Sequence, residues 1–213
     1  MIAYLASHVH AARIDDDLVI LDIQADAYYC APKLGAHLAR PDGRGLTGLA
    51  PSDLERFRTA GLLSERWSAA RALPLHPNQG LNLHAGRTPQ FKDASTMAAA
   101  LADLAFVYPL GSLSRLLSRV RPQSRPALSD LNPDVEQLAL RFAGLAPWAP
   151  VGRKCLVRSF LLRRFLERSG QTADWVFGVR TWPFGAHCWL QCGEVALDDA
   201  PERLAPYQPI FCL

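Results

Sequence analysis

The segment from residue 155 to residue 200 combines one helical pattern with three strand-like runs that follow it closely. On the helical run, positions 155, 159, 162 and 166 fall on one stripe, which is the period of an amphipathic helix. The strand-like runs are DWVFGVRTW (174–182), AHCWLQC (186–192) and EVALDDA (194–200). Gly193-Glu194 is a turn signal, and a hairpin turn joins antiparallel strands. This part is therefore predicted to be α+β, a helix followed by an antiparallel sheet.

The composition is that of a folded chain and argues against several classes of protein. Of the 213 residues, 49% are apolar and 20% are charged, so a substantial core is expected. The formal net charge of +3 is too small to indicate nucleic-acid binding by itself. No window of about 18 apolar residues occurs, so no membrane span is expected. The N-terminus lacks a basic region followed by an apolar stretch, so no secretory signal is expected.

The cysteines are predicted to be reduced thiols. Their number is odd and no export signal is visible, which favours a reducing, cytoplasmic compartment over a disulfide framework. Apart from the first residue of the helical run, we expect them to be core thiols, with the last one a candidate for exposure at the tail. The five are Cys30, Cys155, Cys188, Cys192 and Cys212.

The first 63 residues have the pattern of a small α/β module. Three strands are predicted, followed by a helix with Ser52 as N-cap, Glu55 as its capping-box partner and Gly61 as its stop signal. Three short strands followed by small helices resemble a winged-helix topology. The predicted strands and helix are 3–10, 18–25, 27–31 and 52–61.

A connector rich in Pro, Gly, Asn and His separates this module from a group of helices. It runs over about 64–93, and its weak periodicity indicates a domain boundary. Asn132 is predicted to cap the third of the helices that follow, with Pro133 in the first turn. These helices are predicted over 94–108, 112–120 and 132–147.

Cys155 stands where the loop PVGRK turns into the helical run. At a helix N-terminus, unpaired backbone N–H groups and the dipole favour negative charge, and therefore the thiolate. The neighbouring cations Arg153 and Lys154 would strengthen that field if they point inward. Cys155 is thus a candidate nucleophile.

A partner for this thiol is found on the predicted strands. Alternation places His187, Trp189 and Gln191 on one face of strand 186–192, and Cys188, Leu190 and Cys192 on the other. Asp199 lies twelve residues after His187, and a hairpin would bring the two alongside. The carboxylate could then accept the imidazole N–H and hold its tautomer.

Each of these residues also has an ordinary structural interpretation. A cysteine in an apolar helix usually packs as a small hydrophobe, a strand histidine is often structural, and an aspartate after a strand often serves a turn. Their combination in chain order favours catalysis. A zinc site built from His187, Cys188 and Cys192 is not expected, because they point to opposite faces and no CxxC pair completes the set. No cofactor is expected.

At this point the sequence resembles the lasso peptide biosynthesis B proteins. The helix that begins at Cys155 and the run GAHCWLQCGEVALDD are similar to their C-terminal transglutaminase-like (papain-like) peptidase domain, with its Cys-His-Asp triad. The HAW-type motif is matched by His187-Cys188-Trp189, with Cys188 in place of the usual small residue. The family's aspartate falls on Asp198 or Asp199, of which we favour Asp199. The run LVILDIQADAYYC resembles a RiPP recognition element, the winged helix that binds leader peptides.

The resemblance implies a two-domain leader peptidase. Residues 1–80 would be the recognition element and residues 94–213 the cysteine peptidase. The leader of a precursor peptide would bind the N-terminal module as an added strand, with Tyr28, Tyr29 and Phe57 as candidate contacts in the leader groove. A partner cyclase of the asparagine-synthetase-like type, the family's C protein, would then close the macrolactam of the freed core peptide.

Three other functions share these features. A transglutaminase-like triad could transfer the acyl group to an amine instead of water. A non-catalytic adaptor would only bind the leader, with Cys155 merely buried. DNA binding by the winged-helix-like module is opposed by an acidic strand region at Asp15, Asp16, Asp17, Asp22 and Asp26, despite scattered arginines nearby. Those arginines are Arg40, Arg44, Arg56, Arg58 and Arg66.

Overall fold

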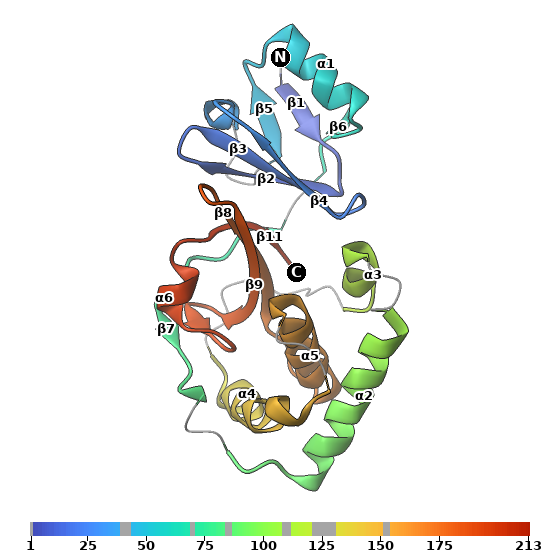
Figure 1. Cartoon of the computed structure of the whole chain (residues 1–213), viewed down its shortest axis with the longest axis vertical. Coiled ribbons are helices and arrows are strands. Elements are labelled where there is room, and N and C mark those ends of the chain that lie inside the picture. Colours follow the sequence, from blue (N-terminus) through green and yellow to red (C-terminus); the bar gives the residue numbers. More distant parts are fainter. Residues whose placement is uncertain are drawn as a thin grey trace.

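The protein is a mixed helix-and-sheet structure in which an N-terminal group of strands lies at one end and a helix-covered sheet at the other (Figure 1). The computed structural model describes residues 2–38, 44–68, 71–83, 87–107, 112–120, 131–150 and 154–213. The predicted α+β class is confirmed. Arg40 and Arg153 lie outside the described residues.

Along the chain, a strand-rich part is followed by helices and then by a second strand-rich part, which is close to the predicted order. The strands are β1 (Ile2–Leu5), β2 (Val9–Ile14), β3 (Asp17–Asp22), β4 (Ala27–Ala31), β5 (Gly45–Thr47), β6 (Leu63–Ser64), β7 (Gln79–Gly80), β8 (Asp174–Arg180), β9 (Gly185–Cys192), β10 (Val195–Ala196) and β11 (Gln208–Cys212). The helices are η1 (Gly35–His37), α1 (Pro51–Thr59), α2 (Phe91–Val107), α3 (Leu113–Ser118), α4 (Pro133–Leu145), η4 (Ala146–Trp148), α5 (Cys155–Arg168) and α6 (Pro201–Leu204).

The C-terminal sheet has the strand order β11-β8-β9-β10-β7 in the described part of the chain. Strands β8, β9 and β10 are antiparallel neighbours, as predicted from their short connections. Strand β7, which comes from the predicted connector, pairs with β10 in parallel at the edge of the sheet. Helix α5 packs against β9, and it also contacts α2 and α4 (Figure 1). The start of α5 is therefore held against the strand that carries His187.

The apolar stripe of α5 forms the centre of the main core. Ser159, Leu162 and Leu166 have exposed fractions of 0%, 1% and 0%, which confirms the predicted helical stripe. Trp175 on β8 is also fully buried and lies near Phe160, with ring centroids 6.1 Å apart. Asn132 caps α4 by accepting a hydrogen bond from the backbone N–H of Asp134, so this predicted cap is confirmed as well.

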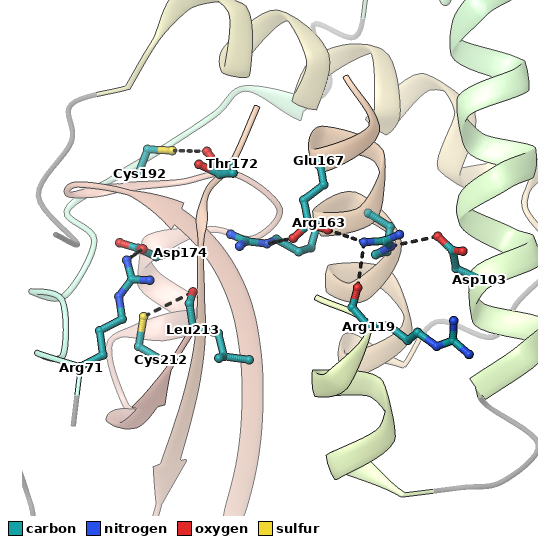
Figure 2. Close-up of polar contacts among 11 residues, drawn as sticks. Arg71, Asp103, Arg119, Arg163, Glu167, Thr172, Asp174, Cys192, Cys212 and Leu213 are labelled. Carbon is teal, nitrogen blue, oxygen red and sulfur yellow. Dashed lines mark hydrogen bonds and ion pairs between the residues drawn. The ribbon is translucent and has the colours of Figure 1, made fainter. Parts of the chain in front are cut away.

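Arginine contacts join α5 to α2 and to the end of α3, and a further ion pair lies within α5 itself (Figure 2). The Arg164 Nε donates to Asp103 on α2 at 2.9 Å, and its Nη1 donates to the backbone carbonyl of Arg119 at 2.8 Å. One residue earlier, Arg163 is fully buried and donates to Glu167 at 2.9 Å. The contacts of Arg164 hold α5 in position against α2 and the end of α3, and therefore help to position its first residue.

The N-terminal part contains two small sheets, with the orders β5-β1-β6 and β2-β3-β4. The central strand of the second sheet, β3, is covered on both faces. Leu18 and Ile20 of β3 pack into an N-terminal core, whereas Val19 and Leu21 point the other way and join the main core. The predicted strand 3–10 is wrong in detail, because a turn at Ala6–His8 divides it into β1 and the start of β2.

Helix α1 begins one residue earlier than predicted and has a different cap. Ala50 is the N-cap, it makes no side-chain capping bond, and Pro51 occupies the first turn. The prediction of Ser52 as N-cap was therefore wrong, because proline is well suited to a first helical position and prefers an extended residue before it. Gly61, with a φ of +71°, ends the helix as expected.

Among the described residues, no helix combines the length and apolarity that crossing a membrane requires.

Candidate active site

Cys155 is the first residue of α5 and is half-buried. The residue before it, Lys154, makes no side-chain cap hydrogen bond, so the first backbone N–H groups of the helix are left without such a cap. Lys154 itself is exposed to solvent. The structure therefore gives no support to the predicted contribution of the Lys154 charge to the positive field around the Cys155 sulfur.

His187 and Asp199 meet at the central strand of the sheet, beside this helix end. His187 lies on β9, and Asp199 follows β10, which pairs with β9. The His187 Nε2 and the Asp199 Oδ2 are 2.7 Å apart, a short charge-assisted hydrogen bond. Asp199 also accepts a hydrogen bond from the backbone N–H of Ala200 at 2.9 Å, and Arg203 lies 3.4 Å from the same Oδ1. These two contacts at Oδ1 orient the Asp199 carboxylate, so that its Oδ2 faces the imidazole of His187.

Electrostatics favour an ion pair between the sulfur and the imidazole. Hydrogen bonds from Cys188 and His187 lower the pKa of Cys155 to about 4, against the opposing effect of burial. Hydrogen bonds to Asp199 and to Cys155 raise the pKa of His187 to about 9. Between these two values the site holds a thiolate and an imidazolium, the form in which a cysteine is nucleophilic.

Asp198, the neighbouring carboxylate, is placed differently. It is buried, and its Oδ1 accepts a hydrogen bond from the backbone N–H of Leu190 at 2.9 Å. Burial raises the pKa of Asp198 to about 7. For Asp199, burial also opposes ionisation, but the hydrogen bond from His187 brings its pKa below the usual range. The structure therefore brings Asp199, and not Asp198, into hydrogen-bond contact with the imidazole.

Cys188 was predicted to be a core thiol on the face of β9 opposite His187, and it is buried there, yet its thiol also reaches Cys155. Its Sγ lies 3.3 Å from the Ser159 Oγ. Ser159 in turn donates to the backbone carbonyl of Cys155 at 2.8 Å and accepts from the Trp175 Nε1 at 2.9 Å. A polar cluster therefore holds the two thiols in contact beneath the start of α5.

An open cleft of about 500 Å³ leads to these groups. Cys155, His187, Cys188, Asp198 and Asp199 all line it, so the sulfur and the imidazole are accessible from one cavity. The rest of the lining comes mainly from α4, η4, α5 and an arginine of α6, and the sequence analysis did not identify these residues. The additional lining residues are Phe142, Ala143, Ala146, Pro147, Ala149, Arg158, Leu161 and Arg203.

The three residues predicted to line a leader groove are not grouped together. Tyr28 and Tyr29 lie on β4, where they line a small apolar pocket of about 130 Å³ together with Trp182 and Phe184 from the β8–β9 turn. Phe57 is buried in the N-terminal core, with an exposed fraction of 9%. This burial argues against the predicted groove contact, because the apolar face of an amphipathic helix packs inward and Phe57 lies on that face.

The remaining cysteines are distributed differently from the prediction. Cys192 and Cys212 are buried, each with its sulfur directed at a backbone carbonyl (Figure 2). Burial raises the pKa of both thiols to about 12. Cys30, expected in the core, is exposed, whereas Cys212, the candidate for exposure, is not. In the part of the chain that the structure describes, no group of three or more His, Cys, Asp or Glu side chains is arranged to hold a metal ion.

Comparison with known proteins agrees with this architecture. A stretch of the chain is 43% identical, over 48 residues, to the microcin J25-processing protein McjB of Escherichia coli. That match covers 22% of this chain and 23% of the relative, so less than a quarter of either protein is compared. No solved structure matches the chain. Residues 83–212, which include α5 and strands β8 to β11, match the transglutaminase-like superfamily. The chain therefore belongs to the transglutaminase-like superfamily.

Proposed function

We propose that the protein is a cysteine peptidase that removes the leader from a lasso peptide precursor. The observation that carries this proposal is the contact of Cys155 with His187, and of His187 with Asp199 at 2.7 Å, in one open cleft. Membership of the transglutaminase-like superfamily supports a thiol-based acyl-transfer reaction. The relative from E. coli is named for processing microcin J25, which agrees with a processing role.

In the proposed mechanism the Cys155 thiolate attacks the scissile carbonyl carbon. The charge that develops on the carbonyl oxygen is stabilised in part by the backbone N–H of Cys155 at the start of α5. The imidazolium of His187 gives its proton to the departing amine, which leaves a thioester on the sulfur. Neutral His187 then takes a proton from the water that hydrolyses the thioester. Asp199 orients the imidazole throughout and stabilises its charged form.

Leader binding is proposed at β4 of the N-terminal module, which would be the winged-helix-like recognition element of residues 1–80. In the described part of its sheet, β4 is an edge strand, and an edge strand can accept an extended peptide by strand addition. Tyr29 has an exposed fraction of 46% and is available to such a peptide. Tyr28 is closer to the cleft: burial raises its pKa, and the nearby Cys188 and Cys155 thiols contribute to that rise.

This arrangement suggests why a leader would be needed. A short scissile sequence in a flexible peptide binds weakly, and a leader held on β4 would raise its effective concentration at the cleft. The freed core peptide would pass to an asparagine-synthetase-like cyclase, which would use the new N-terminus to close the macrolactam. The precursor leader and that cyclase are the partners proposed for this protein.

The test uses a synthetic precursor peptide encoded beside the gene for this chain, with mass analysis of the products. The wild-type protein and a Cys192→Ala control, which removes a thiol buried away from the cleft, should both release the leader. Cys155→Ala and His187→Ala should release none while still binding the leader. Leader release by Cys155→Ala at the wild-type rate would refute the mechanism.

The same assay separates the other functions. With a primary amine such as methylamine present, an acyl transferase would give the amide of the leader in place of its free acid. A non-catalytic adaptor would bind the precursor without cleaving it, and iodoacetamide would then label Cys155 no faster than the exposed Cys30.

A further inference from the structure

The site contains a second thiol that the proposed hydrolysis does not consume. Cys188 lies beside Cys155: the Ser159 Oγ is 3.3 Å from the Cys188 sulfur and donates to the Cys155 carbonyl oxygen at 2.8 Å, and both cysteines line the same cleft. Neither is in a disulfide, and each of the two thiols shifts the pKa of the other.

We propose that Cys155 and Cys188 form a reversible disulfide when a hydroperoxide reaches the cleft, which protects the nucleophile from irreversible oxidation. This inference rests on Cys155 being the reactive thiol of the proposed function. An activated thiolate in an accessible cleft is the type of cysteine that hydroperoxides oxidise first.

The chemistry needs two steps and one equivalent of hydroperoxide. In the first, the Cys155 thiolate attacks one peroxide oxygen, the O–O bond breaks, and the sulfur is oxidised to a sulfenic acid while the leaving oxygen takes a proton. In the second, the sulfur of Cys188 attacks the sulfur of Cys155, the S–O bond breaks, and the departing hydroxide takes the proton from Cys188. With hydrogen peroxide, two thiols give one disulfide and two molecules of water.

The geometry favours the second step. Two cysteines that line one cleft and are bridged by the same serine need only a limited side-chain movement to reach the S–S bond length of about 2 Å. Ser159, whose Oγ is 3.3 Å from the Cys188 sulfur and 2.8 Å from the Cys155 carbonyl oxygen, positions one thiol relative to the backbone of the other. Trp175 anchors that hydroxyl from the buried side at 2.9 Å.

The charge state of Cys188 changes in the required direction. Burial, and then the hydrogen bond and negative charge of Cys155, hold the pKa of Cys188 well above its ordinary value, so it is an inert thiol in the resting site. Oxidation of Cys155 to the uncharged sulfenic acid removes that negative charge. Burial still opposes ionisation of Cys188, but its thiol is deprotonated more readily after Cys155 has been oxidised than before, which is the order that a resolving cysteine requires.

Without a resolving thiol, a sulfenic acid proceeds to sulfinic and sulfonic acids, which thiol reductants do not reverse. The disulfide would instead be opened by an ordinary dithiol, returning the active site. Oxidation would thus switch the proposed peptidase off without destroying it.

The test treats the purified full chain with hydrogen peroxide alone, followed by digestion without reduction and mass analysis. The expected result is a cross-link between the peptides that carry Cys155 and Cys188, with the loss of two hydrogen atoms. Dithiothreitol should remove the cross-link and restore the free thiols. Absence of this cross-link while Cys155 becomes sulfinic or sulfonic acid would overturn the proposal.

Variants provide a second measurement. In Cys188→Ala, the fraction of Cys155 that is irreversibly oxidised should be at least about tenfold larger than in the wild type at the same dose. Cys192→Ala, which removes a buried thiol four positions along the same strand, should behave as wild type. Each protein is compared with its own untreated sample, and circular dichroism shows which variants are folded. Equal irreversible oxidation in wild type and Cys188→Ala would also overturn the proposal.

These readouts do not depend on leader cleavage. A cross-link in a protein that cleaves no precursor would retain the redox inference and reject the proposed function. Cleavage of the precursor by a protein that forms no cross-link would retain the proposed function and reject the redox inference.

Discussion

The hydrogen bond between His187 and Asp199 makes a quantitative prediction about the pH dependence of catalysis. A pKa of about 9 for His187, in place of the ordinary 6.5, means that the folded site favours the imidazolium by about 3 kcal/mol. The bond to Asp199 is the largest cause of that rise, and the contact with Cys155 comes second. Asp199→Asn keeps an oxygen acceptor of the same shape but removes the charge.

The expected consequence is a narrower range of active pH. The proposed mechanism needs Cys155 as thiolate, above about pH 4, and His187 as imidazolium, below about pH 9. In Asp199→Asn the alkaline limb of kcat/KM should move down by about 1 to 2 pH units, because a nearby opposite charge typically accounts for a shift of that size. The maximal rate should fall by about 10²- to 10⁴-fold, since the imidazole loses its orienting partner.

The assay is leader release from the synthetic precursor across the pH range, with the rate of Cys155 alkylation measured alongside. Asp198→Asn is the matched control, because it neutralises the adjacent carboxylate, which hydrogen-bonds the backbone of Leu190 instead of the imidazole. Its alkaline limb should stay within about half a pH unit of the wild type. An unchanged limb in Asp199→Asn, or an equal displacement in Asp198→Asn, would refute the assignment of Asp199.

Two further predictions concern stability. Burial makes the carboxylate of Asp198 costly, and since its folded pKa of about 7 exceeds the unfolded value, the wild type loses stability as pH rises through 7. The free energy of unfolding of Asp198→Asn, relative to that of the wild type, should therefore rise by about 2 to 4 kcal/mol as the pH is raised from about 4 to about 8. Urea denaturation at a series of pH values measures this, and a difference that does not change with pH would contradict it. Gly178→Ala should lower stability by about 1–3 kcal/mol, because an added methyl group overpacks the core. That Cβ would lie 2.8 Å from the fully buried Trp189 ring, and an unchanged melting temperature would show that the ring can move.

Local patterns were sufficient to predict the elements that carry the site. The stripe on α5 and the alternation along β9 fixed which side chains face the core, and the hairpin between β9 and β10 brought position 199 beside position 187. These features depend on residues close in sequence. The catalytic assignment of Cys155, His187 and Asp199 stays a prediction until the variants are measured.

Contacts that depend on packing were not predictable in the same way. Cys188 was correctly assigned to the face opposite His187, but that this face carries the start of α5 depends on the tertiary fold. The proximity of Cys155 and Cys188 could have been predicted only by packing the α5 stripe that carries Cys155 and Ser159 against the face of β9 that carries Cys188. The burial of Phe57 was missed for a related reason, since an aromatic side chain on a short amphipathic helix more often packs in the core than contacts a ligand.

The packing of β3 determines how the N-terminal module could serve the active site. Val19 and Leu21 are fully buried in the main core, while Leu18 and Ile20 are fully buried in the N-terminal one, so a single strand belongs to both. A peptide added to β4 would therefore be held by a sheet that is itself packed against the part carrying α5 and β9. The distance from leader site to cleft would be set by this shared core, and not by the length of a flexible linker. Effective concentration at Cys155 would then depend on the spacing between the leader-binding segment and the scissile bond in the precursor, since the protein side of that spacing is fixed.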